Sequence, residues 1–384
     1  MIFLDRPYVS DFFLNYLCES GRAVLHTPFT EELAGTCPSE RPLNLVDDPE
    51  AEKLCRSGER LYSNSENALD WILLHLGDMP QADSIRIMKD KAALRRLLRE
   101  LDPDFFFQEI PAAELYSTDI SSWPRPFVLK PAVGFFSVGV HTIQRDEDWK
   151  NALEALALDA KQSGFPESVV NQTRFLVEQY IRGEEYAVDL YFDEEGEPVI
   201  LNIFQHRFSS FSDVSDRLYI TGEKIIRANL PRFTAWFRKV NAKIGARNFP
   251  AHVELRVEGD HILPIEFNPL RFAGLCTTDM AAFAFGLNTV DTYLNGKKPD
   301  FDTLLAGRKG KTYSMILLDK PKNLPPDARL DPEKLIAAFQ HVLEARFINI
   351  PELPLFGFLF TETDEDHEDE LERILKSDLT EFLF

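Results

Sequence analysis

A segment of alternating polar and apolar residues in the second half of the chain places the strongest limit on its fold. Residues 252–258 alternate in polarity, a Gly-Asp pair makes a turn, and residues 261–268 return. This pattern predicts a β-hairpin. Glu254 lies on the first predicted strand. Glu266 and Asn268 lie two residues apart on the second strand, so their side chains point to the same face.

The oxygen-bearing side chains of this hairpin are candidate cation ligands. Mg²⁺ prefers carboxylate ligands and keeps waters or substrate phosphates in its coordination shell. Glu266 is flanked by Pro264, Ile265 and Phe267, so it is an acid inside an apolar strand. An acid in such a place needs a partner, for example a metal or an arginine. For the hairpin taken alone, the alternative is two unrelated surface carboxylates.

A lysine ends an apolar strand predicted over residues 127–130, just before a loop that contains Gly134, Ser137 and Gly139. This lysine, Lys130, can act as a point charge on phosphate, and backbone N–H groups of the loop can bind the same anion. The residue order is not that of a Walker loop. A hairpin with an exposed lysine is the alternative.

A third segment joins two predicted strands, 175–180 and 186–192, through Gly183. Backbone groups of an exposed linker can pair with an adenine edge, and a carboxylate a few residues further on can bind ribose hydroxyls. Taken alone, the segment is also compatible with a plain linker between domains.

The remaining pattern predicts an α/β protein, because a strand, a helix and a strand open the chain. Helices are predicted over residues 8–17, 67–76, 85–101, 149–162, 233–244, 278–287, 331–345 and 368–382. Further strands are predicted over residues 140–143, 199–204, 313–318 and 356–361, and residues 27–53 as loop with some helix. The strand over residues 127–130 is expected to stop at Pro131, because the residue before a proline is held extended.

Charge disfavours two classes of partner. The chain has 42 basic and 63 acidic residues, a net charge of −21. Proteins that bind nucleic acid or anionic membrane surfaces need the opposite sign, so neither partner is expected. Residues 361–384 hold ten acidic and two basic residues, which gives −8 in a tail that we expect to form a solvated helix.

Two further features favour a cytoplasmic protein. No stretch approaches the ~18 apolar residues of a membrane span, and Asp5, Arg6 and Asp11 stand where a signal peptide needs an apolar run. The four cysteines lack C-x-x-C spacing and are too sparse for a disulfide scaffold. A reducing compartment is therefore expected.

Together and in this order, these segments resemble the ATP-grasp superfamily of carboxylate–amine and carboxylate–thiol ligases, which includes D-alanine–D-alanine ligase, biotin carboxylase and the large subunit of carbamoyl phosphate synthetase. The matching segments run from about Ile85 to Gly274. The resemblance implies an α/β (α+β) ATP-grasp fold with an N-terminal Rossmann-like pre-grasp domain, a mobile lid subdomain and a central antiparallel sheet. The expected divisions are a pre-grasp domain at 1–84, a linker helix region at 85–118, a lid at 119–182, a large subdomain with the metal site at 183–300, and a C-terminal α/β addition with the acidic tail at 301–384.

The resemblance also implies roles for single residues on the nucleotide side. Lys91 and Lys130 match the family's two phosphate-binding lysines, and the loop with Ser137 and Gly139 matches its mobile loop over the triphosphate. Glu178 matches the adenine-side acid, with Gln179 and Ile181 at the hinge, and Glu185 matches the ribose-binding acid.

On the catalytic side, Glu254, Glu266 and Asn268 match the family's ligands for Mg²⁺ or Mn²⁺. Arg271 resembles the arginine that steadies the acyl phosphate, and together with Lys130 it is an expected catalytic residue. Where the family has Asn-Pro-Arg, this chain has an inserted residue, Leu270.

Other departures concern the lid and the substrate. Phe135-Phe136 stands in the loop where relatives often carry more glycine. Residues 251–254, Ala-His-Val-Glu, resemble the corresponding strand of L-amino acid ligases, which favours an amino acid substrate.

Substrate-binding candidates follow the strand that leaves the nucleotide half. Arg207, beside His206, or Arg256 can pair with a substrate carboxylate. Asp213 and Asp216 can bind a substrate amine. Solvated loop charges are the alternative for all of these residues.

The expected activity is an ATP-dependent ligation. ATP phosphorylates a small-molecule carboxylate, an amine then displaces phosphate from the acyl phosphate, and ADP and phosphate leave. A homodimer is one assembly that fits this expectation. The alternatives are an enzyme like carbamoyl phosphate synthetase or a carboxylase that uses bicarbonate, and a non-catalytic ATP-binding subunit.

Overall fold

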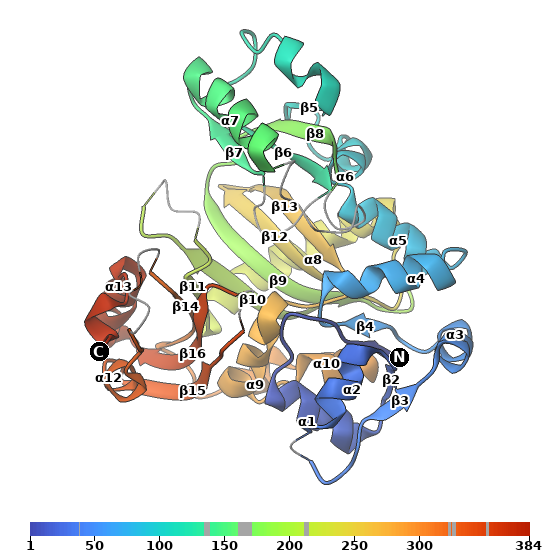
Figure 1. Ribbon diagram of the computed structural model, residues 1–384, viewed down its shortest axis with the longest axis vertical. Helices are drawn as coiled ribbons and strands as arrows, with labels where there is room; N and C mark the ends of the chain where they lie inside the picture. Colours follow the sequence, from blue (N-terminus) through green and yellow to red (C-terminus); the bar gives the residue numbers. More distant parts are fainter. Residues whose placement is uncertain are drawn as a thin grey trace.

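Within the residues that the structure describes, three β-sheets organise the protein (Figure 1). The computed structural model describes residues 1–37, 39–133, 139–159, 171–210, 215–321, 324, 328–350 and 353–384. The division into domains expected above stays a prediction, and the sheets are described here one by one.

The N-terminal sheet is parallel, as the opening strand–helix–strand pattern predicts, with the order β3-β2-β1-β4. Helix α1 starts where the Ser10 side chain accepts a hydrogen bond from the Phe13 N–H, and it ends at Gly21, which adopts the left-handed conformation. One strand inside residues 27–53 escaped the sequence pattern because it is short. The elements are β1 (Ile2–Phe3), α1 (Asp11–Ser20), β2 (Ala23–Leu25), α2 (Pro28–Ala34), β3 (Asn44–Val46), α3 (Asp48–Arg56) and β4 (Tyr62–Ser63).

The helix predicted over residues 85–101 is wrong as a single helix. It is two helices that break at Asp90, whose backbone is extended and whose side chain caps the second helix by accepting from the Ala93 N–H. The break places Lys89 at the end of one helix and Lys91 at the start of the next. The elements of this region are η1 (Glu66–Ala68), α4 (Leu69–His75), α5 (Pro80–Lys89) and α6 (Lys91–Leu98).

A second sheet, with the order β5-β8-β6-β7, forms the upper part of the molecule in Figure 1 and is called the lid sheet below. Its core includes Phe127, Trp149 and Phe175. Strand β6 continues beyond Pro131, contrary to expectation, because the proline sits at a register irregularity where its missing N–H is tolerated. The elements are β5 (Phe107–Pro111), η2 (Ala112–Ser117), β6 (Phe127–Val133), β7 (His141–Ile143), α7 (Asp146–Asp159) and β8 (Asn171–Gln179).

The central sheet is antiparallel and has the order β13-β12-β9-β10-β11-β14-β16-β15. Helix α8 packs against β10 and contributes Phe233, Phe237 and Val240, all fully buried. This helix starts ten residues earlier than predicted because it accommodates Pro231. The elements are β9 (Glu184–Phe192), β10 (Pro198–Arg207), β11 (Leu218–Thr221), α8 (Glu223–Ile244), β12 (Phe249–Glu258), β13 (His261–Pro269), β14 (Lys311–Asp319), β15 (His341–Phe347) and β16 (Leu355–Asp364).

The C-terminal strands extend the central sheet through the β11–β14 pair. The helix predicted over residues 331–345 is wrong in its second half, which forms β15, and the apolar helix predicted over 278–287 is only six residues long. The remaining helical elements are η3 (Gly274–Asp279), α9 (Met280–Phe285), α10 (Thr289–Leu294), α11 (Phe301–Leu304), α12 (Pro332–Ile336), η4 (Glu365–His367), α13 (Asp369–Lys376) and η5 (Thr380–Phe382).

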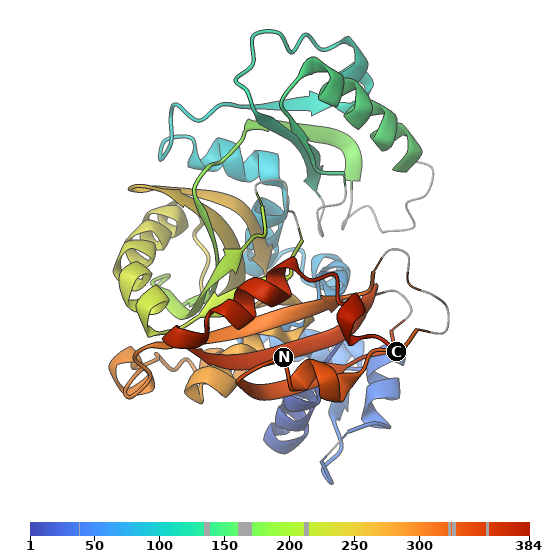
Figure 2. The same ribbon diagram turned by 90° about the vertical axis from the view of Figure 1, so that its left-hand side faces the viewer.

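The acidic tail is amphipathic and docked. Helix α13 ends at Lys376, earlier than predicted, because Ser377 is extended. Its apolar face, Leu371, Ile374 and Leu375, packs with residues of β11, β14 and β16, and Figure 2 shows the helix lying across these C-terminal strands. Asp369 and Glu372 on this helix are exposed, whereas Glu370 is buried and accepts hydrogen bonds from the Gln340 N–H and the Thr363 hydroxyl.

Two of the four cysteines are bonded to each other. Cys18 in α1 and Cys37 form a disulfide, whereas Cys55 and Cys276 are free and buried. The expected cytoplasmic location stays a prediction. Among the described residues, no helix is both long and apolar enough to cross a membrane.

The docked tail yields a stability prediction. Replacing Ile374, which is 1% exposed, with alanine should lower the free energy of unfolding by about 2–5 kcal/mol, because it leaves a cavity under α13. Glu372→Ala on the exposed face of the same helix is the control and should change it by no more than about 0.5 kcal/mol. Urea unfolding measures both variants. Equal values for the two would contradict the packing described here.

Candidate functional site

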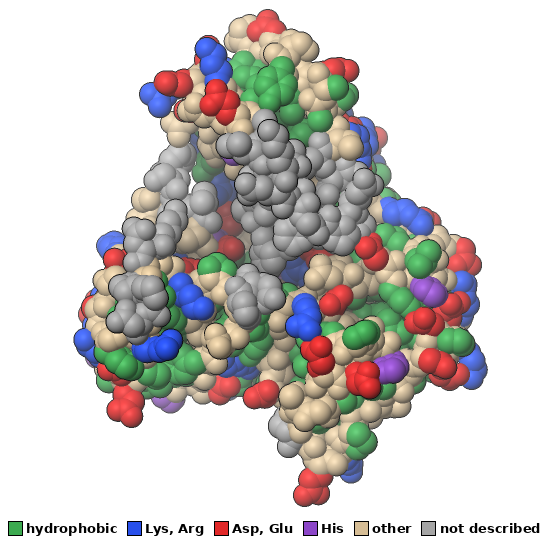
Figure 3. All heavy atoms as spheres, in the orientation of Figure 1, with side chains coloured by type: hydrophobic (Ala, Val, Ile, Leu, Met, Phe, Trp, Pro, Cys, Tyr) green, Lys and Arg blue, Asp and Glu red, His purple; other side chains and the backbone are tan. Residues whose placement is uncertain are grey.

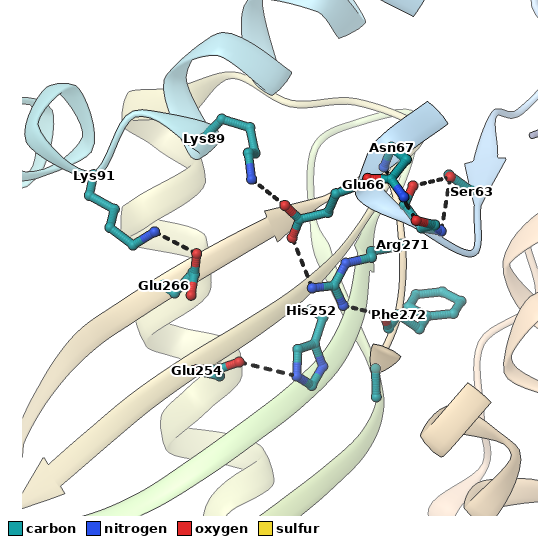
Figure 4. A network of polar contacts seen from close by, with 12 residues as sticks. Ser63, Glu66, Asn67, Lys89, Lys91, His252, Glu254, Glu266, Arg271 and Phe272 are labelled. Carbon is teal, nitrogen blue, oxygen red and sulfur yellow. Dashed lines mark hydrogen bonds and ion pairs between the residues drawn. The ribbon is translucent and has the colours of Figure 1, made fainter. Parts of the chain in front are cut away.

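Two carboxylates face each other on neighbouring strands of the central sheet. Glu254 on β12 is paired in register with Glu266 on β13, and Asn268 is paired with His252. The predicted hairpin is therefore confirmed. All four side chains line a cavity of about 160 Å³, and Figure 4 shows Glu266 directed toward Lys91 and Glu254 directed toward His252.

The two facing acids repel each other electrostatically. Burial raises the pKa of Glu254 well above its ordinary range, and the charge of Glu266 raises it further. A cation between them would remove this penalty. In the part of the chain that the structure describes, no three His, Cys, Asp or Glu side chains form a metal cluster. The set is instead two carboxylates and the Asn268 amide, and these oxygen donors suit Mg²⁺ completed by waters or phosphates.

Lys91 reaches the acidic pair from the first residue of α6. Its Nζ donates to Oε1 of Glu266 at 2.6 Å, as Figure 4 shows. The predicted phosphate-binding lysine and a predicted metal ligand are thus brought together. The break at Asp90 makes this possible, because it starts a new helix that directs Lys91 toward β13.

Lys130 of the lid sheet is buried in an ion-pair cluster. Its Nζ lies 2.5 Å from Oε1 of Glu178, and Nε of Arg95 donates to Oε2 of the same carboxylate at 2.7 Å. Burial alone would raise the pKa of Glu178, but Arg95 and Lys130 outweigh burial and lower it. Lys130 also donates to the carbonyl of Ile265 at 3.4 Å, which places it beside the residue that precedes Glu266.

The hinge between the lid sheet and the central sheet is shaped by a close backbone approach. Gly183 has φ +98°, and a Cβ atom there would lie 2.0 Å from the carbonyl oxygen of Val257, so the position requires glycine. Gln179 pairs with Phe106 through its Oε1 and its backbone N–H. Ile181 is buried, and its carbonyl accepts from Nη1 of Arg256 at 2.8 Å.

Glu185 follows the hinge and is held by two of the predicted substrate residues. It accepts from Nε of Arg256 at 2.9 Å, and Nδ1 of His206 lies 3.0 Å from its carboxylate. Burial raises the pKa of Glu185, but His206 and Arg256 lower it overall. His206 and Arg256 therefore lie with the predicted ribose acid. Arg207 is adjacent to His206 on β10 and so points to the opposite face of the sheet.

Part of the predicted phosphate loop falls outside the described residues, and Ser137 is among those positions. Gly139 is described and has φ +72°, with Pro131 and Leu156 3.2 Å and 3.3 Å from where a Cβ would stand. Glycine is required there for its left-handed backbone. Of the acids proposed for the substrate amine, Asp213 is outside the described residues and Asp216 lines the cavity.

Arg271 is directed toward the N-terminal part of the chain. Its Nη2 donates to Oε1 of Glu66 at 2.9 Å, and Lys89 donates to the other oxygen of Glu66. Burial would raise the pKa of Glu66, but Lys89 and Arg271 lower it to about 2. Arg271 and Glu66 both line the cavity.

Three charged residues of the site escaped the sequence analysis: Glu66, Lys89 and Arg95. Of these three, only Arg95 could have been inferred from the sequence, because it stands four residues after Lys91 and therefore on the same side of α6. Glu66 is followed 205 positions later by its partner Arg271, and no local pattern connects the two.

Comparison with known proteins explains this arrangement. A family model described as an ATP-grasp domain matches residues 123–279. This chain contains an ATP-grasp domain. No curated protein matches the sequence. The ATP-grasp domain spans β6 to η3, and so it holds Lys130, Glu178, Glu185, Glu254, Glu266, Asn268 and Arg271.

Solved structures share the ATP-grasp fold over nearly the whole chain. An L-amino acid ligase from Bacillus licheniformis matches with a TM-score of 0.69 at 16% identity, covering 100% of this chain and 97% of that one. An N5-carboxyaminoimidazole ribonucleotide synthetase from Thermotoga maritima matches with 0.64 at 15%, covering 100% and 98%. A biotin carboxylase from Campylobacter jejuni matches with 0.64 at 11%, covering 94% and 87%. The expected family resemblance and fold class are confirmed.

The facing acids of the ATP-grasp domain yield a prediction. Glu254→Gln should raise the melting temperature of the ligand-free protein by about 2 °C, since it removes the repulsion from Glu266. Because the pKa of Glu254 is raised in the folded state, the wild-type penalty is absent below the ordinary value of 4.5 and grows as the pH rises above it. The gain should therefore increase with pH in thermal melts.

Glu258→Gln, at the exposed end of the same strand, is the control and should leave the melting temperature unchanged. A Glu254→Gln variant that is less stable than wild type at pH 7 would contradict like-charge repulsion as the dominant effect.

Proposed function

We propose that this protein is an ATP-dependent ligase that activates a carboxylate as an acyl phosphate and joins it to an amine. In the first step a carboxylate oxygen attacks the γ-phosphorus and ADP leaves. In the second step the amine nitrogen attacks the acyl carbon, phosphate leaves and the amine loses a proton. The supporting observation is that Lys91 bonds Glu266 of the Glu254–Glu266–Asn268 set, and Lys130 bonds the carbonyl of the adjoining Ile265.

The acids and the amide are the residues that would hold Mg²⁺. The metal, when bound, supplies positive charge to the phosphates and orients them. The rest of the charge compensation comes from the chain. Lys91 is now paired with Glu266 and is placed to exchange this partner for a phosphate oxygen. Lys130 keeps Glu178 as its partner and is placed to donate to phosphate as well. Such positioned charges stabilise the negative charge that develops during phosphoryl transfer.

The nucleotide would lie along the hinge. The backbone at Ile181 is fixed by Arg256, and Glu185 is held ionised beside it. A carboxylate in this state can accept hydrogen bonds from ribose hydroxyls. Glu178 has both of its oxygens bonded to Arg95 and Lys130, so we assign it the role of holding Lys130 in place beneath the phosphates.

The cavity favours a substrate with an apolar part. Its lining includes the apolar side chains of Phe204, Leu275, Met315 and Leu317, called the apolar wall below, together with the polar side chains of Arg271, Asn64 and Asn67. Arg271 can bind a carboxylate or acyl phosphate, and the apolar residues can contact a hydrocarbon side chain. An amino acid with an apolar side chain combines both features, whereas bicarbonate has no group for the apolar wall. We therefore favour an amino acid over bicarbonate.

The proposed partners of the protein are small molecules: a carboxylate and an amine as substrates, together with ATP and Mg²⁺. Charges of both signs are interspersed over the face seen in Figure 3, which does not resemble the single-sign surface of a polyanion-binding protein. A homodimer and a cytoplasmic location stay predictions of the sequence.

Release of ADP and phosphate tests the activity. Purified protein with ATP, Mg²⁺ and pairs of amino acids should form ADP, and bicarbonate alone should not support it. Lys130→Ala should lower kcat by about 100- to 1000-fold because it removes a cation from the phosphates. Glu178 keeps Arg95 as a partner in this variant, so the fold should survive.

Lys150 is an exposed lysine of helix α7, next to the lid sheet. Lys150→Ala is the control and should turn over like wild type. Undiminished turnover by Lys130→Ala would rule out the proposed ligase site. ATP binding without ADP formation over a broad substrate panel would favour the non-catalytic subunit, and turnover with bicarbonate alone would favour the carboxylase-like alternative.

The apolar wall yields a specificity prediction. Leu317→Ala should enlarge the cavity, so that the preferred amino acid shifts toward a bulkier side chain, with the KM for ATP unchanged. Neighbouring Leu318 faces the other side of β14, in the cluster under α13. Leu318→Ala is therefore the matched control, which should lower stability without changing the order of substrates. The ratio of kcat/KM values for small and large amino acids is the measurement.

A further inference from the structure

Glu66 forms a cluster with two cations from distant segments of the chain, Lys89 and Arg271. Glu66 comes from η1 near the N-terminal sheet, Lys89 ends α5, and Arg271 follows β13 (Figure 4). Oε1 of Glu66 accepts from Arg271 at 2.9 Å, and Oε2 accepts from Lys89. The side chains of Glu66, Lys89 and Arg271 are 5%, 8% and 13% exposed. Ion pairs shielded to this degree are held much more firmly than surface pairs.

The backbone before Arg271 explains why the arginine points to Glu66. Leu270, the residue inserted relative to the family pattern, has φ +64° and is fully buried. Its N–H donates to the carbonyl of Pro250 at 2.9 Å, and its carbonyl accepts from the N–H of Ser63 at 2.8 Å. The inserted residue thus ties this segment to β4, three residues before Glu66.

Glu66 is placed to act through Arg271 and not on a ligand. Both of its oxygens are bonded to cations of the chain, and Arg271 lines the same cavity as Glu66 and Asn268. A second bond, from Nη1 of Arg271 to the carbonyl of Phe272 at 3.0 Å, fixes the plane of the guanidinium. The arginine is therefore held in one orientation before any substrate arrives.

We propose that Glu66 is a positioning residue that holds the Arg271 guanidinium toward the acyl phosphate, with Lys89 as the cation that keeps Glu66 in place. This inference rests on the ligase activity proposed above. It assigns the N-terminal part of the chain, outside the matched ATP-grasp domain, a role in the reaction. It also gives the inserted Leu270 a function, since the insertion turns the arginine to this acid.

Glu66→Gln should lower kcat for ADP release about 100-fold while the KM for ATP stays within twofold, because a misplaced catalytic group slows chemistry without weakening nucleotide binding. Glu32→Gln is the matched control. It removes an acid of the same region whose ion pair with Arg6 is at 2.7 Å but exposed, and it should turn over like wild type.

Rescue by guanidinium ion separates positioning from general stability. Arg271→Ala should be nearly inactive, and added guanidinium should restore part of its turnover, because Glu66 still binds the small cation. The double variant Arg271→Ala/Glu66→Gln should show no rescue. Equal rescue in the two proteins would overturn the proposal.

A further variant covers the case that Glu66→Gln does not fold, since it leaves the buried Lys89 without its acid. Glu66→Gln/Lys89→Met removes both charges and should melt near the wild-type temperature while keeping the 100-fold loss of kcat. A folded double variant with wild-type kcat would overturn the positioning role alone. Absence of ADP release by wild type itself would overturn the ligase proposal and the inference with it.

Discussion

The repulsion between Glu254 and Glu266 is the constraint on which the rest of the site depends. Two carboxylates that face each other across neighbouring strands destabilise the fold unless positive charge lies between or beside them. Lys91 supplies part of that charge through Glu266. The remaining deficit is what makes this place suited to a divalent cation. The site is therefore a region where the fold tolerates an unfavourable arrangement because a ligand can relieve it.

The cations around this pair come from elements that the central sheet does not contain. Lys91 starts a helix that follows the N-terminal part, and Lys130 belongs to the lid sheet. Each is held by an acid in the ligand-free protein, so neither lysine is a buried charge without a partner. A chain of net charge −21 can in this way keep a small region positive enough for a triphosphate. The global charge disfavours long polyanions, and the local arrangement of lysines favours a short one.

The hairpin, the lid lysine and the hinge could be predicted from the sequence because each depends on a local pattern. Alternation with a period of two places Glu266 and Asn268 on one face of their strand. The interpretation of Glu254, Glu266 and Asn268 as metal ligands came from the resemblance to the ATP-grasp superfamily. The break at Asp90 was missed, because the polar and apolar spacing of α5 and α6 reads as one helix. Glu66 was missed for a different reason, since its role depends on Arg271, which only folding brings near. Strand β15 was missed because it has only seven residues and comes soon after helix α12.

The network at Glu185 shows how one set of contacts can connect the nucleotide side to the cavity. His206 lies 3.0 Å from Glu185 through Nδ1 and 3.0 Å from the carbonyl of Ser215 through Nε2. Its ring stacks on Tyr219 at a centroid distance of 4.3 Å, and Tyr219 and Asp216 line the cavity. One imidazole therefore touches the predicted ribose acid and the backbone next to the cavity wall. A ribose that draws Glu185 toward its hydroxyls would change the hydrogen bond to His206, and through it the wall on which the second substrate rests. Arg256, which the sequence analysis proposed for a substrate carboxylate, and His206 beside Arg207 both contact Glu185 instead.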